Sequence, residues 1–269
     1  MVRRPAVAGS FYPADPETLR KDLERMTGGR QPPAGPRAVA LLVPHAGYIY
    51  SGEVAAATYT AARLPDRVVI LGPNHTGLGQ RIAVMDEGTW RLPFGEAVID
   101  TGLASAILSG CQAARIDEEA HRREHSLEVQ IPFLQHLLAD LRFVPICVGT
   151  LHLPSLLDLG RAVAGAIRDA GGEVLILMSS DMSHYLPAVV AETQDRKAIE
   201  RVLAIDPESL HRVVLDEGIS MCGIAPTVAG LEAVRLLGGS AARLIAYANS
   251  GDKSGDYQSV VGYAGVAVI

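Results

Sequence analysis

The sequence is poor in cysteine, in aromatic residues and in positive charge, and each shortage argues against a class of protein. Its three cysteines, Cys111, Cys147 and Cys222, lie far apart and form no Cys-x-x-Cys pair. A disulfide framework is therefore not expected, and the cytoplasm is the expected compartment. Lys and Arg total 24 against 30 Asp and Glu, so the formal charge of −6 argues against nucleic acid as a partner. Aromatic residues make up 5% of the chain and give no sign of an aromatic-lined cage.

Long hydrophobic runs and nucleotide-binding motifs are also missing. No stretch approaches the roughly 20 consecutive apolar residues that a helix needs to cross a bilayer. The first residues lack the apolar segment of a secretory signal. The sequence contains no Gly-x-x-x-x-Gly-Lys-[Ser/Thr], no Gly-x-Gly-x-x-Gly and no Gly-x-Ser-x-Gly. We therefore expect no membrane partner and no nucleotide cofactor.

The sequence does have a regular alternation of apolar runs and amphipathic segments. Short apolar runs bounded by turn residues are typical of strands buried on both faces. These runs predict strands at 38–43, 67–71, 142–148, 173–178, 243–248 and 260–268. The segments between them predict helices at 16–26, 52–63, 101–109, 127–139, 155–170, 188–204, 207–216 and 226–237. With no internal repeat, this predicts one α/β domain over residues 1–269, with a mostly parallel or mixed sheet between two layers of helices.

Histidine and aspartate side chains follow three of the predicted strands. His45 and His75 each come just after one strand, and Asp181 and His184 come after a third. Because ligands gather outside the carboxyl ends of the strands in open α/β sheets, these side chains are expected on one rim. Imidazole is the commonest neutral metal ligand, and two of them with one anionic ligand leave positions open for a substrate and O₂ or water. The pattern favours a metal site over unrelated polar loop residues.

The residues alone leave the anionic ligand open between Asp181, Glu124 and Cys222. Cys222 lies beside a glycine in a turn before a predicted helix, where the pKa of a thiol can be lowered. The alternative is a buried cysteine that packs as a small apolar residue. That interpretation suits Cys111 and Cys147 better, because one ends a predicted helix and the other lies within a predicted strand.

The segment from His121 to His125 matches the His-x-x-Glu-His pattern of inverted zinc peptidases. That chemistry needs both histidines on one helical face, but Ser126 is a helix-start residue and Pro132 would break a helix across the segment. We therefore do not expect a peptidase. Glu124, His125 and Ser126 are expected either to support the rim from a loop, as groups behind the ligands or as an acid or base, or to form an exposed charged turn.

Six segments together make the chain resemble the Memo family, whose bacterial and archaeal members are often called AmmeMemoRadiSam system protein B. They extend from near the first residue to beyond residue 220, and several are five or more residues long. The matching segments are Arg4–Pro13, Pro44–Tyr48 with Tyr50–Gly52, Leu71–Thr76, Glu124–Gln130, Ser179–His184 and Met221–Gly223.

The family is similar to class III extradiol dioxygenases, which open catechol rings with Fe(II) bound by two histidines and one glutamate. The resemblance implies that fold for this chain, with His45 and His75 as metal ligands and Cys222 in the position of the carboxylate. It also implies that His184, with Asp181 beside it, acts as the acid and base, and that His125 lines the same cavity. The group's name implies a radical-SAM pathway partner.

The exchange of glutamate for cysteine replaces a hard oxygen ligand by a soft thiolate, which favours Cu(I), Zn(II) or thiolate-bound iron. The leading hypothesis is a redox protein that binds Fe(II), with copper or zinc as alternatives. A small molecule or peptide would bind near Tyr48, Asn74, Glu124 and His125. A second hypothesis is a non-catalytic protein whose pocket binds a peptide, a stored metal ion or a pathway partner. A third is zinc-dependent hydrolysis by a metal-bound water.

Overall fold

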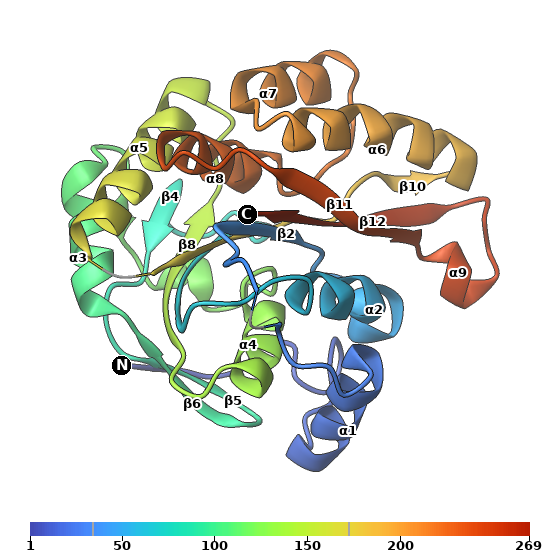
Figure 1. Ribbon diagram of the computed structural model, residues 1–269, viewed down its shortest axis with the longest axis horizontal. Coiled ribbons are helices and arrows are strands. Elements are labelled where there is room, and N and C mark those ends of the chain that lie inside the picture. Colours follow the sequence, from blue (N-terminus) through green and yellow to red (C-terminus); the bar gives the residue numbers. More distant parts are fainter. Residues whose placement is uncertain (34, 172) are drawn as a thin grey trace.

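The computed structural model describes all residues except 34 and 172, and the strands of the described residues form one mixed sheet (Figure 1). The sheet has the order β1-β5-β6-β8-β3-β9-β2-β12-β10, with β11 paired to β12, β4 to β8 and β7 to β4. In chain order the strands are β1 (Val2–Arg3), β2 (Ala40–Val43), β3 (Arg67–Pro73), β4 (Ile82–Val84), β5 (Thr89–Leu92), β6 (Gly95–Ile99), β7 (Arg115–Ile116), β8 (Arg142–Val148), β9 (Leu175–Ser179), β10 (His184–Leu186), β11 (Ala242–Asn249) and β12 (Val260–Val268).

The centre of the sheet is parallel. Strands β8, β3, β9 and β2 are neighbours and run in the same direction, while β12 closes this group with antiparallel pairing to β2. All residues of β2 and β9 are buried, which explains their continuous apolar sequences. The carboxyl ends of β2, β3 and β9 therefore meet at one edge of the sheet.

Helices cover both faces of the sheet, and each face has its own hydrophobic core (Figure 1). Successive side chains of a strand point to opposite faces, so Leu42 enters one core and Leu41 the other. Helices α3, α5, α6, α7 and α8 pack on the first face, and α1, α2 and α4 pack on the second. The helices are α1 (Pro16–Thr27), α2 (Tyr48–Tyr59), α3 (Thr101–Gly110), α4 (Ile131–Leu137), α5 (Leu153–Asp169), α6 (Ala188–Leu203), α7 (Pro207–Asp216), α8 (Ile224–Leu236) and α9 (Gly251–Ser254).

The predicted α/β architecture with helices on both faces is confirmed, and so are the six predicted strands. The prediction missed β1, β4, β5, β6, β7 and β10, which are two to five residues long and too short to show a period. None of the helices in the described part of the chain is long and apolar enough to cross a membrane.

Two helix predictions need correction. Instead of one helix at 127–139, the chain forms a 3₁₀ turn at Glu128–Gln130 and then the short helix α4. Pro132 is tolerated because it lies in the first turn of α4, where its missing N–H has no helical acceptor. Helix α2 begins at Tyr48 rather than residue 52, since its N-cap, Gly47, gives no side-chain capping signal.

Candidate metal centre

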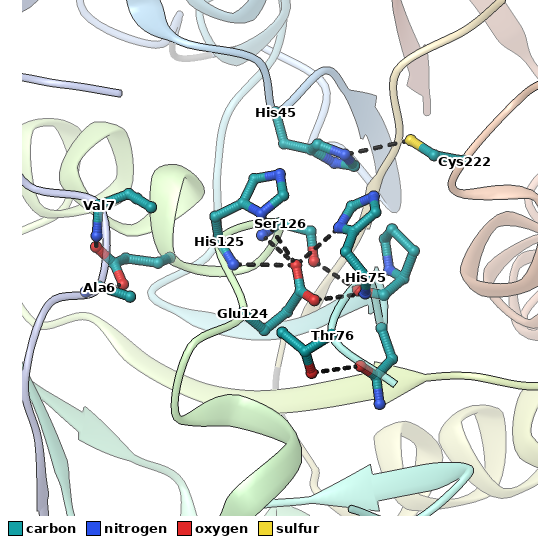
Figure 2. A network of polar contacts seen from close by, with 12 residues as sticks. Ala6, Val7, His45, His75, Thr76, Glu124, His125, Ser126 and Cys222 are labelled. Carbon is teal, nitrogen blue, oxygen red and sulfur yellow. Dashed lines mark hydrogen bonds and ion pairs between the residues drawn. The ribbon is translucent and has the colours of Figure 1, made fainter. Parts of the chain in front are cut away.

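Three histidines converge at the carboxyl edge of the sheet (Figure 2). His45 follows β2, His75 follows β3, and His125 lies in the loop before the Glu128–Gln130 turn. Each offers one ring nitrogen, and the three nitrogens lie within 4.8 Å of one another. The ring centroids of His75 and His125 are 4.6 Å apart and nearly parallel, and the ring of His45 stands edge-on to both. This arrangement can hold a metal ion.

Cys222 is a further donor beside this cluster. Its Sγ lies 3.2 Å from Nε2 of His45, at the turn that leads into α8 (Figure 2). The backbone N–H of Asp181 donates to the same sulfur at 3.3 Å. Burial and the nearby Asp181 carboxylate raise the pKa of the Cys222 thiol, which corrects the expectation of a lowered value. A metal ion bound here must displace the thiol proton.

Two glycines allow the surrounding loops to approach the strand ends closely. A Cβ atom on Gly72 in β3 would lie 2.8 Å from Oγ of Ser126, whose hydroxyl donates to the carbonyl of Pro73. A Cβ atom on Gly223 would lie 2.4 Å from the carbonyl oxygen of Ser179 at the end of β9. Glycine at these positions therefore brings the loops of His125 and Cys222 against the sheet.

A chain of buried hydrogen bonds fixes which nitrogen of His45 carries a proton. Oε1 of Gln130 accepts from the Tyr59 hydroxyl at 2.7 Å, so its Nε2 is the donor to Oγ of Ser179 at 2.8 Å. Ser179 donates its own proton to the Ser126 carbonyl at 2.6 Å. Its oxygen is thus an acceptor for Nδ1 of His45 at 2.9 Å.

His45 therefore carries its proton on Nδ1 and presents an unprotonated Nε2 to the cluster. Burial lowers the pKa of His45 well below its ordinary value, and the neighbouring His125 and His75 add to this shift. Burial and the neighbouring imidazoles thus keep His45 neutral, as a metal ligand must be.

Glu124 fixes the protonated ring nitrogen of His75, as Ser179 does for His45. Its buried carboxylate accepts from Nδ1 of His75 at 2.9 Å and from the backbone N–H groups of His75, His125 and Ser126. Burial opposes ionisation of Glu124, but these donors outweigh it and lower its pKa to about 2. The Nδ1 of His75 is therefore a donor, and its Nε2 is left for a ligand. The carboxylate thus orients His75 from behind, which is one of the positions expected for this loop, and its contact with a substrate stays a prediction.

Asp181 and His184 lie near the cluster but do not pair as predicted. Asp181 accepts from the backbone N–H groups of His45 at 2.7 Å and Ala46 at 3.3 Å, and burial raises its pKa to about 6. The ring of His184 is held by Ser220, whose carbonyl oxygen lies 2.9 Å from Nδ1. Ser220 rather than Asp181 thus orients His184, because a carbonyl only accepts, and Nε2 of His184 is the basic nitrogen. The acid–base function of His184 stays a prediction.

Two residues predicted to contact a substrate have their polar atoms engaged elsewhere. Tyr48 is 5% exposed, and its hydroxyl donates to the Val129 carbonyl at 2.6 Å, contrary to the predicted contact. The Asn74 side chain donates to the Leu78 carbonyl and accepts from Thr76 and Gly77, so it shapes its own loop. Its contact with a substrate stays a prediction.

The prediction that the segment 121–125 does not form a peptidase helix agrees with the structure. His121 lies in a 3₁₀ turn, buried against Trp90, whereas His125 is in the cluster. All three cysteines are free, and Cys111 and Cys147 are buried, as predicted. Sequence reasoning missed the residues that orient His45, because a buried serine and glutamine have no distinctive spacing. It also missed Phe11, whose ring lies 4.8 Å from that of His125.

Comparison with known proteins gives a consistent result along the whole chain. A sequence model of a family described as "Memo-like protein" matches residues 3–267. A MEMO1 family protein of Methanopyrus kandleri is 44% identical over 99% of this chain and 98% of the relative. MEMO1 family proteins of Methanothermobacter thermautotrophicus and Aquifex aeolicus are 41% and 42% identical, each over at least 98% of both chains.

A solved structure shares the fold. The crystal structure of the uncharacterized protein JW3007 from Escherichia coli K12 matches with a TM-score of 0.60 over 86% of this chain and 99% of that one. The two sequences are 16% identical, so the likeness concerns the fold alone.

Proposed function

Starting from the fact that this chain belongs to the Memo-like protein family, we propose that it is a redox protein that binds one Fe(II) ion. His45, His75 and Cys222 would hold the ion. The observation that carries this proposal is the protonation pattern of the two histidines. Both have a hydrogen-bond acceptor on Nδ1, and both direct an unprotonated Nε2 to the same cluster.

The donor set supports a transition metal. Two imidazoles and a thiolate match the preference of Fe(II), Cu(I) and Zn(II), whereas Mg²⁺ and Ca²⁺ prefer oxygen ligands. A site with three protein ligands also leaves positions for a small molecule or a peptide. When bound, Fe(II) would supply O₂-linked redox chemistry of the dioxygenase kind.

The chain's own residues would orient and protonate the bound ligand. His184 has a basic Nε2, since its Nδ1 donates to Ser220, and it would take or give the proton of the ligand. Asp181 holds the backbone of His45 and Ala46 in place. Phe11 lies against His125 and would exclude water from one side of the site.

The three-histidine cluster favours zinc-dependent hydrolysis as a second candidate. Three neutral imidazoles and one water are the ligands of many catalytic zinc sites. In that case His125 would be the third ligand instead of Cys222, and activity would need no O₂. The two candidates therefore differ in which side chain the ion requires.

Elemental analysis and Fe(II) binding of protein purified without oxygen test the proposal. Wild type would be compared with Cys222→Ser and His125→Ala, with Cys111→Ser as the matched control for a buried thiol outside the site. We expect near-stoichiometric iron that is lost or weakened in Cys222→Ser and retained in the other two variants. EPR of the nitric oxide adduct would then show the change in ligands.

The opposite pattern would identify the three-histidine zinc site: zinc in wild type, lost in His125→Ala and retained in Cys222→Ser. No bound transition metal in wild type would overturn both candidates.

A further inference from the structure

The first thirteen residues are fastened to the loop that carries Glu124 and His125. Arg3 is 6% exposed, and its guanidinium donates at 2.8 Å to two backbone carbonyls of that loop, those of His121 and Glu124. A third nitrogen of the same group donates to the carboxylate of Glu128. Because the fork of an arginine is planar and rigid, these three bonds fix the positions of residues 121, 124 and 128 relative to one another.

Glu128 makes the reciprocal connection. Its carboxylate is buried and accepts from the backbone N–H groups of Ala6 at 2.7 Å and Val7 at 3.0 Å, besides Arg3. The hydroxyl of Tyr12 also donates to it at 2.7 Å. Removing one partner of such a buried ion pair strongly destabilises the folded protein, because the remaining charge stays buried without its counterpart.

The same segment also reaches the site itself. The ring of Phe11 lies against His125, and its carbonyl accepts from the backbone N–H of Tyr48 at 2.8 Å, just beyond the turn of His45. One stretch of chain thus contacts two of the three loops that carry the histidines. The side chains of Arg3 and Glu128 hydrogen-bond to backbone, to Tyr12 and to each other rather than to a histidine ring of the cluster. Arg3 therefore acts on the site through the backbone of residues 121–128, and Glu128 adds a direct electrostatic effect, since its charge favours the protonated form of His125.

We propose that Arg3 and Glu128 are positioning residues of the metal centre, which hold the loop at 121–128 so that Glu124 orients His75 and His125 faces the cluster. This inference rests on the metal site proposed above. Metal ligands must be held to within about 0.5 Å, and a loop achieves this only when buried contacts fix it. Arg3 supplies such contacts on both sides of Glu124, at the His121 carbonyl and at the Glu128 carboxylate.

Metal binding by Glu128→Gln and Arg3→Lys tests the inference, with Co(II) as the probe because its visible absorption reports ligand geometry. Loss of a group that orients metal ligands typically weakens affinity about 10- to 100-fold. We expect that loss in Glu128→Gln, with an altered Co(II) spectrum. Lysine keeps the charge of Arg3 but cannot donate to both carbonyls, so Arg3→Lys should also weaken binding.

The matched control is Asp100→Asn. It breaks the half-buried pair between Asp100 and Arg67, which lies at the start of β3, at the opposite end of that strand from His75. The control should lose stability to urea but keep the wild-type Co(II) affinity and spectrum. Amide hydrogen exchange of residues 121–130 in metal-free protein should become faster in Glu128→Gln and Arg3→Lys but not in the control.

The outcomes separate the two proposals. If wild type binds Co(II), and the two variants bind it with the same affinity and spectrum as Asp100→Asn, the positioning function is refuted and the metal site stands. If wild type binds no Co(II) or Fe(II), the proposed function fails, and the inference fails with it. Should Glu128→Gln not fold, Arg3→Lys decides, because it keeps the buried charge balanced.

Discussion

The hydroxyl of Ser179 decides the protonation of His45, and Ser179→Ala should therefore weaken metal binding. The serine oxygen accepts from Nδ1 of His45 and from Gln130, and its proton goes to the Ser126 carbonyl. Alanine leaves the His45 N–H and the Ser126 carbonyl without these partners, whereas Gln130 keeps its bond to Pro44. Each buried group left unpaired costs about 1–3 kcal/mol of folding free energy.

The effect on metal affinity follows from the freed imidazole. Without an acceptor on Nδ1, His45 can carry its proton on Nε2, where it blocks a metal ion. Removing the partner of a histidine ligand typically weakens binding about 10- to 100-fold, or about 1.4–2.7 kcal/mol. We expect a loss in this range for Fe(II) or Co(II) measured by competition with a chelator.

The control for this prediction is Thr58→Val. Its hydroxyl is buried and donates only to the Val54 carbonyl within α2, so the variant loses one hydrogen bond without touching the site. ¹⁵N NMR of metal-free protein would show the tautomer of His45 directly. Wild-type affinity and an unchanged Nδ1–H tautomer in Ser179→Ala would refute the reasoning.

Three further predictions concern Glu124, His184 and His121. Glu124→Gln should weaken Fe(II) binding about 10- to 100-fold in a chelator competition, because His75 loses the carboxylate on Nδ1. His184→Ala should leave the stoichiometry of bound metal unchanged and abolish metal-dependent turnover; full turnover would show that His184 is not the acid or base. Burial lowers the pKa of His121 from 6.5 to about 4, so the unfolded chain binds its proton first and stability falls as the pH drops from 6.5 towards 4. His121→Leu should remove about 2–3 kcal/mol of the loss between pH 7 and 4.5 in urea unfolding, and an unchanged pH dependence in this variant would contradict the prediction.

The sequence was sufficient to predict the strands that are buried on both faces. It was insufficient to predict short strands that depend on pairing with one neighbour. Strands such as β3 and β9 are buried on both faces, so their apolar runs predict them directly. The carboxyl ends of β2 and β3 then place His45 and His75 on one rim without any knowledge of side-chain packing. By contrast, β10 has three residues and pairs with β12 through an irregular register, which no period in the sequence reveals.

The partners of the site residues were harder to predict than the residues themselves. His184 was expected to pair with Asp181, three positions earlier, yet it bonds to Ser220, 36 positions later. For Glu124 the residues left several positions open, as the anionic ligand, as a substrate contact or behind the ligands, and only the structure shows its carboxylate buried among N–H donors. Such pairings depend on where loops meet in three dimensions, and the local sequence does not encode them.

The loop from Glu124 to Ser126 connects the orientation of the two proposed histidine ligands. Its Glu124 carboxylate holds Nδ1 of His75, and its Ser126 carbonyl takes the proton of Ser179, which in turn fixes His45. The backbone N–H of Ser126 also donates to the Glu124 carboxylate, so the connections to His75 and to His45 are joined within three residues. A shift of this loop would therefore disturb both unprotonated Nε2 atoms together rather than one at a time. Because Arg3 and Glu128 hold this loop through buried hydrogen bonds, the geometry of the proposed metal centre depends on residues whose side chains bond to backbone, to Tyr12 and to each other rather than to the histidine rings.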